Sequence, residues 1–349
     1  MPSEKKQLTF IDLFAGIGGF HIGFDEATKG KAKCVFVSEW DNAARETYRH
    51  NFISRPGNSH IFKEVAADDG STLTPFFAGD ITKITEQLEN APHLIPDFDI
   101  MCGGFPCQPF SNAGLRKGLE ETRGTLFFDM LKILQVKKAQ GTPAKGFFLE
   151  NVRGLKNHMS GSKKTISIIE EKLRAEGYSF HLFEVWASDH GVPQHRPRLF
   201  MIGFLTNLPD DYPNAKAILT ETQAAEEIFK RETLTYEHGK TPMHKIQPSL
   251  AEILGGKIVD GGREVGYTLR VGGRGSGLND RRNWDTYLVD GETMRLEPHH
   301  GLRLQGFPDW YEFPETVAKS QAMKQVGNSV AVPAIRYFAH KIALALGKA

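Results

Sequence analysis

Residues 8–19 read Leu-Thr-Phe-Ile-Asp-Leu-Phe-Ala-Gly-Ile-Gly-Gly, an apolar run that stops at a cluster of glycines. The run from Leu8 to Phe14 predicts a short buried strand, and the glycines predict a tight turn at its carboxyl end. Phe20–Ala27 has helical character, and a second apolar run, Cys34–Ser38, ends at an acid, Glu39. A strand, a glycine turn, a helix and a second strand with a terminal acid make half of a nucleotide-binding βαβ unit.

The glycine turn at residues 15–19 indicates what this unit can bind. Glycines let the backbone approach a ligand closely, and an acid such as Glu39 can accept hydrogen bonds from two ribose hydroxyls. Glu39 lies 20 residues beyond Gly19, close to the spacing of dinucleotide-binding proteins. Counted from Gly16, however, the third glycine position is His21, which argues against a pyrophosphate-binding turn. A ligand with adenosine but no phosphates fits better, and a plain turn is the alternative.

Apolar runs and amphipathic stretches continue to alternate as far as residue 205. We predict strands at Phe98–Cys102, Gly146–Glu150, Phe180–Ala187 and Leu199–Leu205, and helices at Asn42–His50, Thr125–Lys138 and Thr165–Ala175. This alternation predicts an α/β fold with a Rossmann-like, mostly parallel sheet. The polar segment Asn51–Gly79 reads as a surface connection with some local structure.

Composition restricts the class of protein. The 349 residues carry a formal net charge of only +1, so any nucleic-acid surface must come from local segregation of charge. Three cysteines fit neither a disulfide framework nor a zinc pattern, which favours a reducing compartment. The first residues lack the apolar core of a signal peptide, and no apolar run is long enough to span a membrane. We therefore expect a cytoplasmic protein of two domains, without a metal site.

A constrained loop, Gly103–Ser111, follows one of the predicted strands and reads Gly-Gly-Phe-Pro-Cys-Gln-Pro-Phe-Ser. In open α/β sheets, ligands and reacting groups gather at the carboxyl ends of the strands. A thiol held there near free backbone N–H groups can be tuned toward the thiolate. Cys107 is therefore a candidate nucleophile, and a buried cysteine in an ordinary turn is the alternative.

Other charged residues also stand at predicted strand ends. Glu150 directly follows an apolar run, where it either caps the turn or has a raised pKa that lets it donate or share a proton. Arg196 and Arg198 flank Pro197 and predict a rigid pair that binds an anion or a carboxylate. Asp80 either reaches an adenine amino group or caps the next helix.

Seven short motifs occur together along the chain. In order they are FIDLFAGIGGF, SEW, GDI, GGFPCQPFS, ENV, QHRPR and VGNSV. This ordered set resembles that of the cytosine-5 DNA methyltransferases of bacterial restriction–modification, over Leu8–Leu205 and Arg303–Ile342. The resemblance implies a Rossmann-like S-adenosylmethionine-dependent domain and a smaller, irregular target-recognition domain.

The resemblance also implies roles for individual residues. The S-adenosylmethionine pocket would be lined by Phe14, Gly16, Ile17, Gly18, Gly19, Glu39 on the ribose, Trp40 on the adenine, Asp80, Ile81, Asn328 and Ser329. The catalytic residues would be Cys107 as nucleophile, Glu150 on the cytosine edge, and Arg196 and Arg198 as an orienting pair.

The implied chemistry explains why these residue types are needed. Carbon 5 of cytosine is a weak nucleophile, and addition of the Cys107 thiolate to carbon 6 activates it toward a sulfonium methyl group. Glu150 would hold N3 and the exocyclic amine while charge develops on the ring. A base inside a stacked duplex is out of reach, so the cytosine must flip out, with residues 111–124 as the lid.

From residue 206 to about residue 300 the strand–helix alternation fades, and the sequence becomes rich in glycine and arginine. Between Arg270 and Arg282 there are four arginines and one acid. Arginines on glycine-rich loops can follow the DNA backbone and reach guanine edges, although a solvated surface loop is the alternative. The candidate DNA contacts are Arg270, Arg274, Arg281 and Arg282, together with Gln108 and Ser111 beside the thiol.

Taken together, the motifs predict a catalytic domain of residues 1–205 with 302–349, interrupted by a recognition domain of residues 206–301. An apolar helix face near the end of the chain, which includes Ile335, Phe338 and Ile342, is expected to pack on the first domain's sheet. The predicted partner is double-stranded DNA, and the enzyme is expected to be a monomer. A cognate restriction endonuclease would act on the same site without direct binding.

The alternatives come from three classes of protein. A tRNA cytosine-5 methyltransferase has similar motifs, but the arginine-rich segment favours duplex DNA. His21 at the third glycine position argues against a nicotinamide oxidoreductase. The presence of Cys107, Glu150 and the arginine pair argues against a non-catalytic DNA-binding protein.

Overall fold

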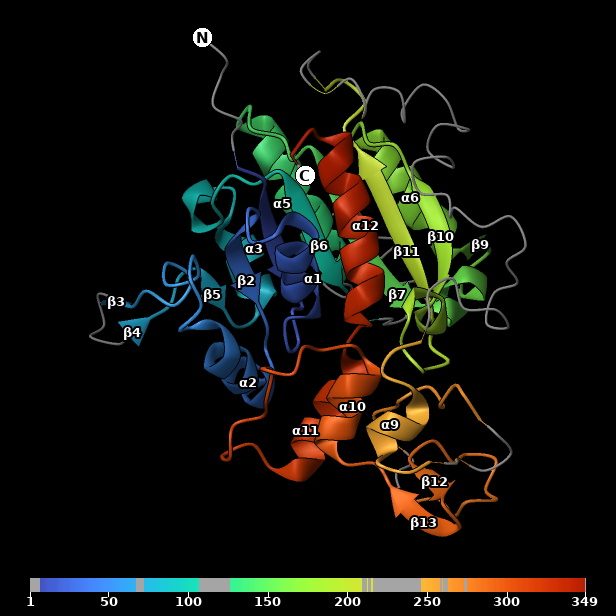
Figure 1. The fold of residues 1–349 in the computed structure, drawn as a ribbon. Coiled ribbons are helices and arrows are strands. Elements are labelled where there is room, and N and C mark those ends of the chain that lie inside the picture. The colour runs from blue at the N-terminus through green and yellow to red at the C-terminus, as the bar shows by residue number, and fades with distance from the viewer. Residues whose placement is uncertain are drawn as a thin grey trace.

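The computed structural model describes residues 7–66, 72–106, 126–208, 212, 215, 246–257, 259, 263–272 and 275–348. Its centre is a seven-stranded sheet with the strand order β10-β11-β7-β6-β1-β2-β5 (Figure 1). The strands are β1 (Thr9–Leu13), β2 (Lys33–Ser38), β5 (Phe77–Ala78), β6 (Ile100–Gly104), β7 (Gly146–Val152), β10 (His181–Trp186) and β11 (Pro197–Phe204). Strands β5, β2, β1, β6 and β7 are parallel, whereas β11 runs antiparallel to both β7 and β10. The predicted α/β fold with a mostly parallel sheet is confirmed.

The connections between parallel strands place helices on both faces of the sheet. The helices of this part are α1 (Gly19–Thr28), α2 (Asn42–Phe52), α3 (Ile81–Gln87), α5 (Leu126–Ala139) and α6 (Thr165–Ala175). The step from β1 to β2 and the step from β6 to β7 lead in opposite directions across the sheet. Because such crossovers are right-handed, α1 and α5 cover opposite faces. Helix α1 packs against α12 (Val332–Ala345), whereas α3 and α6 each contact α5.

The later part of the chain lies beyond one edge of the sheet before it returns. Figure 1 shows α9, α10, α11, β12 and β13 together below the sheet, while α12 runs back up across it. These elements are α9 (Leu250–Leu254), β12 (Thr286–Val289), β13 (Glu292–Arg295), α10 (Pro298–Leu304) and α11 (Lys319–Asn328). Three short helices, η1 (Pro92–Leu94), η2 (Arg153–Asn157) and η3 (Ala187–His190), and the pairs β3 (Val65–Ala66) with β4 (Thr72–Leu73) and β8 (Met159–Ser160) with β9 (Lys163–Lys164) complete the described elements.

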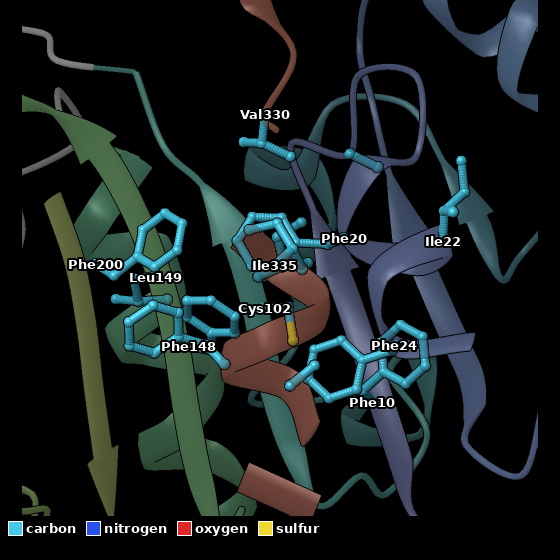
Figure 2. Close-up of a cluster of buried hydrophobic side chains, with 14 of the residues drawn as sticks. Phe10, Phe20, Ile22, Phe24, Cys102, Phe148, Leu149, Phe200, Val330 and Ile335 are labelled. Carbon is cyan, nitrogen blue, oxygen red and sulfur yellow. The ribbon is translucent and has the colours of Figure 1, made fainter. Parts of the chain in front are cut away.

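An aromatic core joins the sheet to α1 and α12. Figure 2 shows Cys102 of β6 within this cluster, with Phe148 on one side and Phe10 and Phe24 on the other. The rings of Phe10 and Phe24 stack with centroids 4.6 Å apart. Phe338 of α12 contacts Phe148 and Phe200 at centroid distances of 6.0 Å and 5.1 Å. The expectation that the apolar face of the last helix packs on the sheet is confirmed.

One part of the sequence interpretation was incomplete. Residues 51–79 were expected to form a surface connection with some local structure, but no strand of the central sheet was predicted there. Phe77–Ala78 is the edge strand β5 and pairs with Val37 and Ser38 of β2. A pairing of two residues is too short to leave a periodic pattern in the sequence. In the later segment Trp284 and Tyr287 are buried, as core residues. Among the described residues, no helix is long and apolar enough to cross a membrane.

Candidate active site

The glycine turn after β1 has a backbone that most side chains disfavour. Phe14, Gly16 and Gly18 have φ angles of +56°, +54° and +82°, in the left-handed region where glycine is preferred. A Cβ atom on Gly18 would lie 2.4 Å from the ring of Phe52, so this position also needs glycine for space. A Cβ atom on Gly16 would meet nothing within 4 Å, which leaves room for a ligand against the backbone.

His21, which stands where a dinucleotide-binding turn has glycine, belongs to the core. Its Nδ1 lies 2.6 Å from the hydroxyl oxygen of Tyr48, and its ring stacks on Phe52 at a centroid distance of 4.4 Å. Burial lowers the pKa of His21 to about 3, so its ring is neutral. The first turn of α1 is therefore packed against aromatic rings.

Glu39 is held at the end of β2 by the turn that it faces. Its two carboxylate oxygens accept hydrogen bonds from the backbone N–H groups of Gly16, at 2.7 Å, and Asp41, at 2.8 Å. Burial raises the pKa of Glu39, and the two backbone donors oppose this shift. Each oxygen keeps a second lone pair with which it can accept a hydrogen bond from a ligand hydroxyl.

The other residues predicted for the cofactor pocket lie on neighbouring segments. Trp40 is 80% exposed, a large aromatic surface left open to solvent beside Glu39. Asp80 is exposed and caps α3, because its Oδ1 accepts from the N–H of Thr82 at 3.0 Å. Ile81, the first residue of α3, is buried. Capping, one of the two readings left open for Asp80, is thus observed.

The last two predicted cofactor residues come from the far end of the chain. Asn328 ends α11 and is exposed, while Ser329 is buried. A Cβ atom on Gly19 would lie 3.5 Å from the Oγ of Ser329, so the two segments are in contact. The backbone carbonyl of Ile17 accepts a hydrogen bond from the hydroxyl of Tyr311 at 2.7 Å. The structure therefore brings the predicted residues after β1, β2, β5 and α11 together at the carboxyl ends of the parallel strands.

The pair of Glu150 and Arg198 also lies at the carboxyl ends of the parallel strands. Glu150 is near the end of β7, is buried, and its Oε1 forms an ion pair with Nε of Arg198 at 2.8 Å. Burial raises the pKa of Glu150, and Arg198 and then Arg196 oppose this shift. A Cβ atom on Gly104 would lie 2.8 Å from the second oxygen, Oε2, which therefore faces the end of the neighbouring strand β6. This arrangement can hold or share a proton next to the segment that leads to Cys107.

The two arginines make different contacts, and their role as one orienting pair stays a prediction. Arg198 binds Glu150, whereas Arg196 is buried and donates to three backbone carbonyls, those of Leu269, Gly327 and Ser329. Its guanidinium therefore joins the segment before Arg270 to the end of α11. The sequence could not separate the two roles, because the acceptors of Arg196 are carbonyl groups with no residue signature.

Asn151 is a further site residue that the sequence analysis did not single out. It is 2% exposed, and its Nδ2 donates to the carbonyl of Phe105 at 2.9 Å while its Oδ1 accepts from the N–H of Val152. It thereby ties the end of β7 to the two residues that precede Cys107. A polar side chain directly after Glu150 was the available signal.

The candidate DNA contacts are only partly described. Arg270, Arg281 and Arg282 are exposed, and Arg282 forms an ion pair with Asp280 at 2.9 Å. Close packing against Gly327, whose Cβ position would lie 2.6 Å from the carbonyl of Arg270, fixes the backbone there. Four predicted site residues lie outside the described residues: Cys107, Gln108, Ser111 and Arg274.

Comparison with known proteins gives one consistent family. The model of the family described as C-5 cytosine-specific DNA methylase matches residues 8–344. The chain is 39% identical to the type II methyltransferase M.HpaII of Haemophilus parainfluenzae, over 99% of this chain and 92% of that protein. It is 33% identical to the type II methyltransferase M.HhaI of Haemophilus parahaemolyticus, over 98% of this chain and 97% of that protein.

Solved structures agree on the fold. The DNMT2 mutant of Spodoptera frugiperda has a TM-score of 0.58 with 18% identity, and the match covers 97% of this chain and 99% of that one. A putative DNA modification methyltransferase of an Escherichia coli prophage has a TM-score of 0.55 with 20% identity, over 97% and 99% of the two chains. The chain thus belongs to the C-5 cytosine-specific DNA methylase family and is a DNA cytosine-5 methyltransferase.

Proposed function

We propose that the chain transfers a methyl group from S-adenosylmethionine to carbon 5 of a flipped-out cytosine in a specific site of duplex DNA, as the modification enzyme of a restriction–modification system. The observation that carries this proposal is the buried pair of Glu150 and Arg198 at the carboxyl ends of the parallel strands, where the cofactor residues gather. The relatives named type II methyltransferases support the restriction–modification part.

The residues at the glycine turn fit S-adenosylmethionine. Gly16 leaves open space against the backbone, Glu39 keeps free acceptor lone pairs for ribose hydroxyls, and Trp40 offers an exposed ring for the adenine. His21, a core residue at the third glycine position of a dinucleotide-binding turn, argues for a ligand without a pyrophosphate. When bound, S-adenosylmethionine supplies an electrophilic methyl group.

Glu150 and Arg198 would act on the cytosine ring. A carboxyl group with a raised pKa retains its proton at higher pH, so Glu150 can donate a hydrogen bond to N3 of the cytosine. Arg198 fixes one oxygen of that carboxyl group, which leaves Oε2 to face the base. Donation to N3 stabilises the charge that the ring gains when a thiolate adds to carbon 6.

Cys107 is the proposed nucleophile on the evidence of its motif. Residues Phe105 and Pro106, which precede it, follow directly from β6 and are tied to β7 by Asn151. Addition of its thiolate to carbon 6 forms a carbon–sulfur bond, and loss of the proton from carbon 5 after methylation breaks it again. The cytosine must leave the duplex stack to reach this group.

We propose that residues 206–301 read the DNA site and that residues 1–205 with 302–349 carry the chemistry. The exposed Arg270, Arg281 and Arg282 support this division, since exposed arginines can contact phosphates and guanine edges. The enzyme would act as a monomer, and a cognate endonuclease would cut the same site without binding to it.

Cys107→Ser tests the mechanism. We expect methyl transfer to duplex DNA from S-adenosylmethionine carrying a tritiated methyl group to fall below detection, because a serine hydroxyl is far less ionised than a thiol at neutral pH. Binding of S-adenosylhomocysteine, measured by titration calorimetry, should stay within about twofold of wild type, since the proposed pocket lies on other segments. The wild-type protein with duplex DNA and with tRNA gives the matched comparison.

Each unfavourable outcome contradicts a different part of the proposal. Turnover by the Cys107→Ser variant at a rate comparable to wild type would remove the covalent mechanism. Loss of S-adenosylhomocysteine binding in that variant would show that Cys107 belongs to the cofactor pocket. Methylation of tRNA in preference to duplex DNA would overturn the assignment of the substrate.

A further inference from the structure

Arg45, in the first half of α2, makes three contacts that the proposed chemistry does not use. Its Nη1 donates hydrogen bonds to the carbonyl oxygens of Glu39, at 3.2 Å, and Ala78. Its Nη2 donates to the carbonyl oxygen of Phe77 at 2.9 Å. The guanidinium carbon also lies 4.3 Å from the centre of the Phe77 ring, which fixes the plane of the group.

These three carbonyls belong to the ends of two neighbouring strands. Glu39 directly follows β2, while Phe77 and Ala78 form the whole of β5. Strand β5 is at the edge of the sheet and is paired with β2 over two residues. So short a pairing holds an edge strand weakly, and a planar donor that bridges both strand ends adds three charge-assisted hydrogen bonds to it.

The bridged strand ends carry both acids of the proposed cofactor pocket. The carboxyl group of Glu39 belongs to the same residue whose carbonyl Arg45 binds, and Asp80 lies two residues beyond Ala78. The N–H of Glu39 donates to the carbonyl of Ala78 at 3.0 Å, so the two segments already touch at this point. Arg45 therefore bridges the segment that carries the acid proposed for the ribose and the segment that leads to the acid proposed for the adenine.

We propose that Arg45 is a positioning residue of the cofactor pocket. Its guanidinium holds Glu39 and the segment from Ala78 to Asp80 at the spacing that adenosine requires. The inference rests on the proposed S-adenosylmethionine site. Arginine is suited to this task because its planar fork offers five N–H donors in fixed directions. A lysine offers one point charge and cannot hold three carbonyls in one plane.

The first test measures cofactor affinity in the full chain by calorimetric titration with S-adenosylhomocysteine. We expect Arg45→Gln to raise Kd by about tenfold or more, the size of one lost hydrogen bond of a charged donor, and Arg45→Lys to give a smaller increase. Arg49→Gln is the matched control, because Arg49 lies one turn further along α2 and pairs with the exposed Glu64. Its Kd should stay within about twofold of wild type.

Steady-state kinetics separate positioning from a general loss of structure. In Arg45→Gln the KM for S-adenosylmethionine should rise with the Kd, while kcat at saturating cofactor and the affinity for duplex DNA stay within about twofold of wild type. A fall in kcat with an unchanged KM for cofactor would overturn the inference. So would loss of the folded state in both Arg45→Gln and Arg45→Lys, since Arg45 would then hold the fold and not the pocket.

A mutant cycle shows whether Arg45 acts through the two acids. In the background of Glu39→Gln with Asp80→Asn, the further change Arg45→Gln should raise Kd by less than about twofold, because the groups that it positions are already altered. A rise in Kd as large as that caused by Arg45→Gln in the wild-type background would contradict the inference. If wild type binds S-adenosylhomocysteine and Arg45→Gln binds equally well, the inference alone fails; if wild type does not bind, the cofactor assignment fails.

Discussion

Burial of the carboxyl group of Glu150 determines how the site should respond to pH. Its pKa is raised from the ordinary value of 4.5 by burial, against the opposing effects of Arg198 and Arg196. A raised pKa means that the protonated form persists to higher pH than in a free glutamate. If the protonated form donates to N3 of cytosine, the rate of methyl transfer depends on this proton.

We therefore predict that the single-turnover rate of methyl transfer falls as the pH rises through the raised pKa of Glu150. Glu150→Gln, which cannot give up a proton, should lower the rate by about 100-fold or more at every pH, the usual size of a general acid's contribution. Glu64→Gln removes an exposed carboxylate and serves as the control. A rate that instead rises with pH near 4.5 would mean that the ionised form is required.

At the scale of single residues, the sequence predicted the groups that have a chemical signature and missed those defined by backbone partners. Glu39 and Glu150 could be found because each acid follows an apolar strand. Arg45 and Asn151 bind carbonyl groups, which every residue has, so only the folded chain shows what they contact. The contacts of Arg196 with backbone carbonyls could not be predicted from the sequence for the same reason.

At the scale of elements, the contact between α1 and α12 depends on a glycine. A Cβ atom on Gly23 would lie 2.5 Å and 2.8 Å from side-chain atoms of Ile335 and 3.1 Å from the backbone nitrogen of Arg336. Alanine improves helix propensity by about 1 kcal/mol, but overpacking costs about 1–3 kcal/mol. Because one neighbour is backbone, the helices must move apart, and we expect the cost of overpacking to exceed the gain.

We predict that Gly23→Ala lowers the free energy of unfolding by about 1 kcal/mol, measured by urea denaturation. Gly154→Ala is the matched control, since a Cβ atom there would meet nothing within 4 Å, and it should leave stability unchanged within about 0.5 kcal/mol. A Gly23→Ala protein at least as stable as wild type would show that α1 and α12 adjust without cost.

The elements that the sequence predicted well are those with a sustained period. The alternation of apolar strands and amphipathic helices up to residue 205 gave most of the central sheet, and the apolar face of α12 indicated where that helix packs. Strand β5 has two residues and is defined only by its pairing with β2, so no local pattern identifies it. The observed ends of several strands and helices differ from the predicted ends by a few residues, because the apolar pattern does not define where an element stops.

At the scale of the whole molecule, Asp99 ties distant parts of the chain together. Its carboxylate accepts hydrogen bonds from the N–H of Thr9 at 3.0 Å, from Lys348 at 2.8 Å and from Lys145. Burial alone would raise the pKa of Asp99, but the two lysines and the Thr9 donor hold it below the ordinary value of 3.8. One side chain thus joins the start of β1, the segment before β7 and the residues after α12.

We predict that Asp99→Asn lowers the free energy of unfolding at pH 7 by about 2 kcal/mol, because the carboxylate loses hydrogen bonds from charged donors. A depressed pKa in the folded state stabilises the protein fully above the unfolded value of 3.8, and the effect is lost as the pH falls through the lower folded value. Thermal unfolding of both proteins should therefore differ at pH 7 and converge toward acid pH. Asp309→Asn, at an exposed position, is the control; a difference that grows in acid would contradict this account.

The division into two domains is the part of the whole-molecule interpretation that stays a prediction. Arg196 and Gln194 bind the segment before Arg270 tightly, since Gln194 Oε1 accepts from the N–H of Leu269 at 3.3 Å and the N–H of His195 donates to Gly266 at 2.8 Å. These contacts link the proposed recognition segment to the strand that carries Arg198. Such long-range links depend on the fold as a whole and have no local signature.

Bisulfite sequencing of duplex DNA incubated with S-adenosylmethionine and the protein tests the central claim most directly, with Cys107→Ser as the inactive control. The account predicts unconverted cytosines at one position of a single recurring short sequence, on DNA treated with wild type, and complete conversion on DNA treated with the variant. If bisulfite converts every cytosine of DNA treated with wild type, under conditions where wild type binds S-adenosylhomocysteine, the assignment as a DNA cytosine-5 methyltransferase is contradicted.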